Sequence, residues 1–110
     1  MSRSQRRKGV ERERALVNLH RKLGVHAERV PLSGASRYQG RGHDIDVYPF
    51  GQEAGALVAE LKARGSGEGF KTLERWLADN DLLFLWRDRQ QPLVVVPWRV
   101  WERILEKVRA

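Results

Sequence analysis

The sequence predicts an α/β protein in which a single mixed β-sheet is flanked by helices. Apolar residues recur at three- and four-residue spacing in three segments, as amphipathic helices require. Short alternating or wholly apolar runs, bounded by turn residues, lie between these segments and predict strands. The resulting order is α-β-β-β-α-β-β-α, without an internal repeat.

Charge and composition narrow the class of partner. The chain of 110 residues has 21 Lys and Arg against 14 Asp and Glu, a formal net charge of +7, which favours a polyanionic partner such as nucleic acid. It has no cysteine, which excludes disulfides, thiolate metal sites and a cysteine nucleophile. Neither a signal peptide nor a long apolar run is seen, so we expect no membrane partner and a cytoplasmic location.

The first residues differ from the rest in composition. Residues 1–8 are polar and basic without periodicity, and we expect a flexible basic arm there. The length of the remainder suits one layered core, so residues 9–110 are predicted to form a single domain.

A helix opens this predicted domain. Apolar residues repeat with helical spacing from about Val10 to Leu23, and Gly24 follows at the position where helices commonly end. Residues 25–30 alternate loosely as a short strand. A loop rich in turn residues follows over residues 31–42, and a loop of that length in so small a domain is usually functional.

A β-hairpin is predicted next. Residues 44–50 alternate as a strand, residues 51–55 form a turn, and residues 56–63 form the second strand. The second half of the chain predicts a helix, two strands buried on both faces and a closing helix, over residues 70–78, 82–86, 93–96 and 98–108.

Two carboxylates and an ammonium group are expected to meet at one end of this hairpin. Glu60 and Lys62 are two residues apart on a strand, so their side chains point to the same face. If the hairpin turns near Gly51, Asp44 at the start of one strand lies opposite Glu60 near the end of the other. The three side chains then converge.

This set of groups suits a hard divalent cation. Asp44, Glu60 and the backbone carbonyl of Leu61 supply the oxygen ligands that Mg²⁺ prefers, with Mn²⁺ as a substitute. A bound metal activates water and neutralises charge on a phosphodiester, while Lys62 is positioned to hold or deprotonate the attacking water. The expected chemistry is phosphodiester hydrolysis. The alternative is an ordinary solvated strand face with Asp44 capping a turn.

A family resemblance is carried by Arg7-Lys8-Gly9, Glu13-Arg14, Leu16, Arg29-Val30-Pro31-Leu32-Ser33-Gly34, Asp44-Ile45 and Glu60-Leu61-Lys62. With these residues the sequence resembles the archaeal-type Holliday junction resolvases and their viral relatives over roughly residues 7–64, and beyond that by element order. His43 stands where the family signature has proline, which leaves the metal ligands intact. If the protein is a viral relative, we expect it in the host cytoplasm.

The resemblance implies a restriction-endonuclease-like PD-(D/E)XK core and a homodimer that cuts opposing strands of four-way DNA junctions in magnesium. It adds Glu13 to the metal ligands and the catalytic residues, and Ser33 to the catalytic residues, beside Asp44, Glu60 and Lys62. The DNA-contacting candidates are Arg7, Lys8, Arg14, Arg29, Arg37, Arg41 and Arg64.

Helical geometry separates Glu13 from the neighbouring Glu11. At 100° per residue, Glu13 lies at the edge of the face that packs on the sheet, whereas Glu11 points to solvent. A carboxylate on a packing face needs a cation, which either the metal or a basic neighbour such as Arg29 can supply.

The sequence therefore predicts a magnesium-dependent endonuclease that cuts branched, double-stranded DNA. Two alternatives stay open. One is a related PD-(D/E)XK nuclease acting on ordinary duplex or flap DNA, and the other is a catalytically silent nucleic-acid-binding module.

Overall fold

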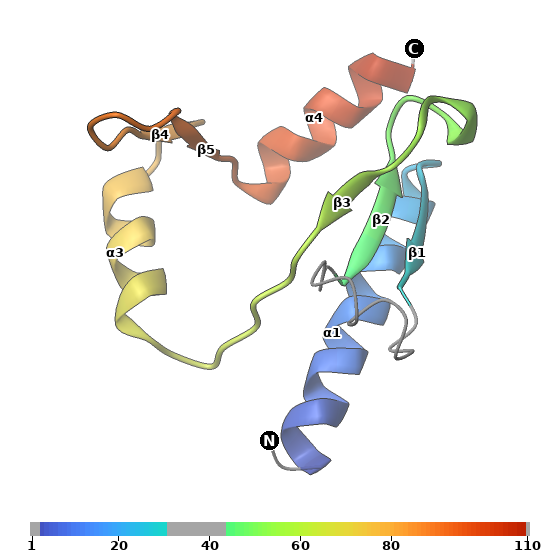
Figure 1. Ribbon diagram of the computed structural model, residues 1–110, viewed down its shortest axis with the longest axis horizontal. Helices are drawn as coiled ribbons and strands as arrows, with labels where there is room; N and C mark the ends of the chain where they lie inside the picture. The colour runs from blue at the N-terminus through green and yellow to red at the C-terminus, as the bar shows by residue number, and fades with distance from the viewer. Residues whose placement is uncertain (1–2, 31–43, 110) are drawn as a thin grey trace. The chain divides into compact units, whose positions relative to one another are not determined.

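The protein is a small mixed α/β protein, and a computed structural model describes residues 3–30 and 44–109 (Figure 1). These described residues form three α-helices and two antiparallel sheets. Their order of helices and strands agrees with the sequence-based prediction. The chain divides into two compact units, one of residues 1–63 with 105–110 and one of residues 64–104. A single domain over residues 9–110, as predicted from the sequence, requires the two units to share one core, and it stays a prediction.

Helix α1 spans Arg3–Lys22 and begins well before the predicted start at Val10. Its first turns are polar, and Arg, Gln and Lys have high helix propensity, so apolar periodicity alone misses them. The segment expected as an arm is therefore helical from Arg3 onward. The helix ends at Lys22, and Gly24 closes it as predicted, with a φ of +81° and an amide that donates to the Arg21 carbonyl at 2.9 Å.

Strands β1 (His26–Arg29), β2 (Ile45–Tyr48) and β3 (Leu57–Ala59) form the sheet of this first unit, in that order and all antiparallel. The turn between β2 and β3 contains a short 3₁₀ helix, η1 (Gln52–Ala54). The predicted hairpin is confirmed, with Ile45 opposite Ala59 and Val47 opposite Leu57.

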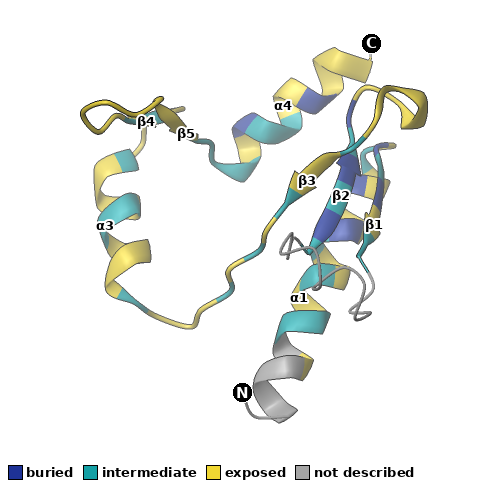
Figure 2. Cartoon of the chain, viewed as in Figure 1, coloured by how far each residue is buried: buried dark blue, intermediate teal, exposed yellow. Residues whose placement is uncertain are grey.

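The core of this unit lies where α1 meets β1 and β2 (Figure 2). Strand alternation puts Ala27, Ile45 and Val47 on one face of the sheet, and all three are buried. The buried Val17 and His20 come from α1, and the His20 Nδ1 lies 2.8 Å from the Leu16 carbonyl oxygen. A buried histidine with a backbone partner is a structural group here.

Replacing Ile45 with alanine is expected to lower the free energy of unfolding by about 3 kcal/mol, because Ile45 is 1% exposed and truncation leaves a cavity. Urea denaturation followed by circular dichroism measures the change. The control is Val58→Ala, whose side chain is 64% exposed and whose truncation should cost less than about 0.5 kcal/mol. Equal effects of the two substitutions would contradict this assignment of the core.

The second unit contains α3 (Glu68–Leu77), β4 (Leu83–Leu85), β5 (Leu93–Val95) and most of α4 (Trp98–Arg109). β4 and β5 pair as an antiparallel hairpin. We predicted one mixed sheet, whereas the described residues form two separate antiparallel sheets. Periodicity places both strands, but the prediction that they are buried on both faces is wrong, since Phe84, Leu93 and Val94 are exposed. An apolar run also contains no information on which distant strands pair.

A side-chain contact fixes the start of α4 within this unit. The Arg99 guanidinium donates to Asp81 Oδ1 at 2.6 Å and to the Asn80 carbonyl at 3.1 Å. The hydrogen bond from Arg99, followed by its charge, holds the pKa of Asp81 below its usual value of 3.8. Because the pKa is lowered on folding, the contact stabilises the fold above pH 3.8 and is lost as the pH falls through the lower, folded-state pKa.

Candidate active site

Asp44 lies at the start of β2, directly beside the segment that follows β3. Its amide donates to the Ala59 carbonyl at 2.8 Å, and its Oδ2 accepts a hydrogen bond from the Leu61 amide at 2.7 Å. Continuing the strand register by one residue from Ile45 and Ala59 sets Asp44 opposite Glu60. The expected juxtaposition of Asp44 with Glu60 and Leu61 is therefore present.

Glu60 and Lys62 form an ion pair next to Asp44. The distance between Glu60 Oε1 and Lys62 Nζ is 3.2 Å, and both side chains are more than half exposed. A solvent-exposed pair of this kind contributes little to stability. The charges of Glu60 and Lys62 are thus accessible to a ligand. The hydrogen bond from the Leu61 amide to Asp44 Oδ2 holds the backbone between these two residues.

β3 is shorter than predicted, since it ends at Ala59 and the prediction extended it to Ala63. A strand is defined by pairing, and β2 begins at Ile45, opposite Ala59. Glu60 and Lys62 therefore follow directly after the paired region, where their backbone is less constrained by a neighbouring strand.

The donor set fits a hard cation that keeps several waters. Two carboxylates and one carbonyl oxygen, from Asp44, Glu60 and Leu61, are ligands of the kind Mg²⁺ takes. Asp44 uses one carboxylate oxygen for the Leu61 amide, which leaves the other for a ligand. Within residues 3–30 and 44–109, no group of three or more acidic or histidine side chains that could hold one metal ion is found, and Glu13 as a third carboxylate ligand stays a prediction.

Glu13 lies on the packing face of α1, as the helical geometry predicted, and its cation is Arg29. The Arg29 Nε donates to Glu13 Oε1 at 3.1 Å, and the Glu13 side chain is only 13% exposed. Arg29 alternates with Glu28 along β1 and lies on the same sheet face as the buried Ala27. Arg29, which the sequence offered as an alternative cation to the metal ion, is thus the observed partner of Glu13.

Glu13→Gln is expected to lower the free energy of unfolding by about 2 kcal/mol, because the mostly buried Arg29 guanidinium loses its counter-charge. If Glu13 is also catalytic, as the resemblance implies, the cleavage rate falls by more than that stability loss explains. Glu11→Gln is the matched control, since Glu11 is exposed on the same helix and should change neither quantity. Chemical denaturation and single-turnover cleavage in saturating Mg²⁺ measure both, and the reverse ranking would contradict the helix register.

The remaining candidates divide into three groups. Arg7, Arg14 and Arg64 are exposed, and Lys8 lies within α1. Arg29 is half-buried and paired with Glu13, so its predicted role as a DNA contact competes with a structural one. Ser33, Arg37 and Arg41, together with His43, lie outside the described residues.

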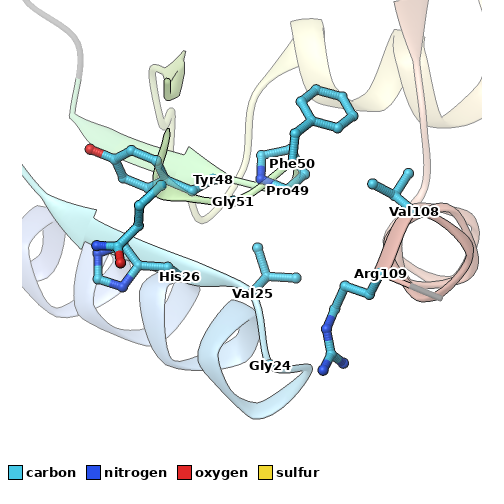
Figure 3. A pocket seen from close by; sticks show the side chains of 10 residues that line it. Gly24, Val25, His26, Tyr48, Pro49, Phe50, Gly51, Val108 and Arg109 are labelled. Carbon is cyan, nitrogen blue, oxygen red and sulfur yellow. The ribbon is translucent and has the colours of Figure 1, made fainter. Parts of the chain in front are cut away.

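A surface hollow that was not predicted from the sequence lies at the other end of β2. It has a volume of about 530 Å³, and Figure 3 shows His26 and Tyr48 on one side with Val108 and Arg109 on the other. The rings of His26 and Tyr48 lie 5.1 Å apart. Burial, followed by the charges of Glu28 and Asp46, raises the pKa of Tyr48. Because distant segments of the chain form this hollow, no local motif indicates it.

No protein-family model, curated protein or solved structure matches this chain. Within the described ranges, no helix is long and apolar enough to cross a membrane.

Proposed function

We propose that this chain is a magnesium-dependent endonuclease of the PD-(D/E)XK type that cuts branched DNA, with Asp44, Glu60 and Lys62 at its active site. One observation carries the proposal: the Asp44 carboxylate is hydrogen-bonded to the Leu61 amide, beside the exposed pair of Glu60 and Lys62. A net charge of +7 supports a polyanionic substrate. The restriction-endonuclease-like core is part of the same proposal.

Each residue has a separate task in this proposal. Asp44 and Glu60 hold the cation through their carboxylates, and the Leu61 carbonyl adds a neutral oxygen. A bound magnesium ion supplies charge neutralisation at the scissile phosphate and lowers the pKa of a water. Lys62 orients the attacking water or takes its proton, and its ammonium form stabilises the negative charge that develops on the phosphate.

The substrate is proposed to be a four-way junction and the active form a homodimer, on the basis of the resemblance to junction resolvases. Two opposing strands must be cut to resolve a junction, and a twofold-symmetric pair of active sites supplies both cuts. Binding is expected to weaken steeply with salt because each phosphate contact releases counterions.

Comparing three substrates tests the proposed selectivity. A labelled synthetic four-way junction, a linear duplex of the same sequence and a flap substrate are incubated with the full chain in Mg²⁺. We expect the junction to be cut at least about tenfold faster than the duplex, a difference of about 1.4 kcal/mol in transition-state stabilisation. Equal rates on all three would favour a general nuclease, and tight binding without cleavage of any would favour the silent binding module.

A further inference from the structure

The tip of the β4–β5 hairpin carries a tryptophan that is both exposed and held in place. Trp86 directly follows β4 and is 75% exposed. Its indole Nε1 donates to the Gln90 carbonyl at 2.9 Å, and the Gln90 amide donates to the Arg87 carbonyl at 3.1 Å. The ring therefore has few orientations available and little conformational freedom to lose on binding.

A second aromatic ring lies on the same side of this hairpin. Phe84 lies in β4, two residues before Trp86, and strand alternation extended by one residue beyond β4 sets both on one face. Phe84 is 63% exposed, and its cross-strand neighbour Val94 is 52% exposed. The two exposed aromatic rings offer faces on which a planar group can stack.

Two arginines flank this surface. Arg87 and Arg89 are exposed, and neither guanidinium is engaged in an ion pair within residues 3–30 and 44–109. Arg89 has a φ of +64°, a left-handed conformation that glycine or asparagine adopts more easily. This conformation belongs to the turn between β4 and β5, in which the Gln90 amide donates to the Arg87 carbonyl.

We propose that the β4–β5 tip binds unpaired nucleotides, with a base stacked on Trp86 and the adjoining phosphates held by Arg87 and Arg89. Aromatic side chains with neighbouring cations are the usual means of binding single-stranded nucleic acid without sequence preference. The arginines favour a phosphate-bearing ligand over an apolar protein surface, and the net charge of +7 favours a polyanion such as nucleic acid. This inference rests on the proposed function, since it assigns to the nuclease a substrate that also contains unpaired bases.

Binding of a short single-stranded oligo(dT), measured by fluorescence anisotropy with the full chain in EDTA, tests the site without any cleavage. Trp86→Leu is expected to weaken this binding about tenfold, as loss of one stacked base does, and to leave a duplex of the same length within about twofold. Trp76→Leu is the matched control, since Trp76 is 54% exposed on α3 of the same unit and should change neither affinity.

Two further variants separate binding from folding. Trp86→Phe keeps an aromatic ring and should retain most of the oligo(dT) affinity. Arg89→Gly removes the guanidinium at a backbone position that suits glycine, so it should weaken binding while preserving or raising the thermal unfolding midpoint. Equal losses for single strand and duplex, or an effect of Trp76→Leu as large as that of Trp86→Leu, would overturn the proposal. So would Trp86-dependent binding to anionic lipid vesicles without binding to oligo(dT).

The inference and the proposed function can fail separately. If oligo(dT) binding depends on Trp86 but no DNA is cut in Mg²⁺, the nuclease proposal fails and the stacking site stands. If the junction is cut but Trp86→Leu leaves oligo(dT) binding unchanged, the stacking site fails and the nuclease proposal stands.

Discussion

Asp44→Asn is expected to reduce junction cleavage about a hundredfold while leaving junction binding unchanged or tighter. The amide is nearly the same shape and can still accept the hydrogen bond from the Leu61 amide, so the local backbone should be preserved. What is lost is the negative charge that holds the cation, and electrostatic stabilisation of this kind is worth about two to three orders of magnitude in rate. Single-turnover cleavage in saturating Mg²⁺ measures the loss.

Asp46→Asn is the matched control for this substitution. Asp46 lies two residues further along β2, on the same face of the sheet and opposite Val58. The same chemical change is made there without touching the end of the hairpin at Glu60. Near wild-type cleavage by Asp44→Asn, or an equal loss in Asp46→Asn, would show that the proposed site is misplaced.

Lys62→Ala is expected to reduce cleavage by about a hundredfold, the effect typical of losing a general acid–base group, while metal binding is retained. Lys62 pairs with Glu60 at 3.2 Å, so its removal leaves both proposed carboxylate ligands in place. Because the pair is exposed, the stability of the fold should hardly change. Titration with Mn²⁺, followed by electron paramagnetic resonance, reports metal binding independently of cleavage.

The control for Lys62 is Lys71→Ala, an exposed lysine on α3. It removes the same charge from the protein without touching the segment after β3, and cleavage should stay within about twofold of wild type. Loss of Mn²⁺ binding in Lys62→Ala would count against a role on water and phosphate. It would indicate instead that Lys62 organises Glu60 as a ligand.

Local patterns predict the hairpin of the candidate site well. Alternation over residues 44–50 and 56–63, with glycines between them, predicts both strands and their register, and the pairing of Ile45 with Ala59 confirms it. The meeting of Asp44 with the Leu61 amide follows from that register. The site thus depends on contacts between segments that are close in sequence, which is why it could be predicted.

Long-range contacts could not be predicted in the same way. Helical geometry correctly placed Glu13 on the packing face of α1, but the choice of Arg29 as its cation depends on how β1 lies against the helix. The hollow beside Tyr48 and Arg109 has the same origin, since it joins a strand to the end of α4. The first turns of α1, from Arg3 onward, are polar and therefore lack the apolar periodicity from which a helix is predicted.

Cleavage of a labelled four-way junction by the purified full chain, with Mg²⁺ and with EDTA, tests the central claim most directly. We predict that Mg²⁺ produces discrete nicked products bearing a phosphate at one end of each break, that EDTA abolishes them, and that Asp44→Asn does not form them at a comparable rate. Junction binding without any cleavage in Mg²⁺ or Mn²⁺ would contradict the claim, as would cleavage that persists in EDTA.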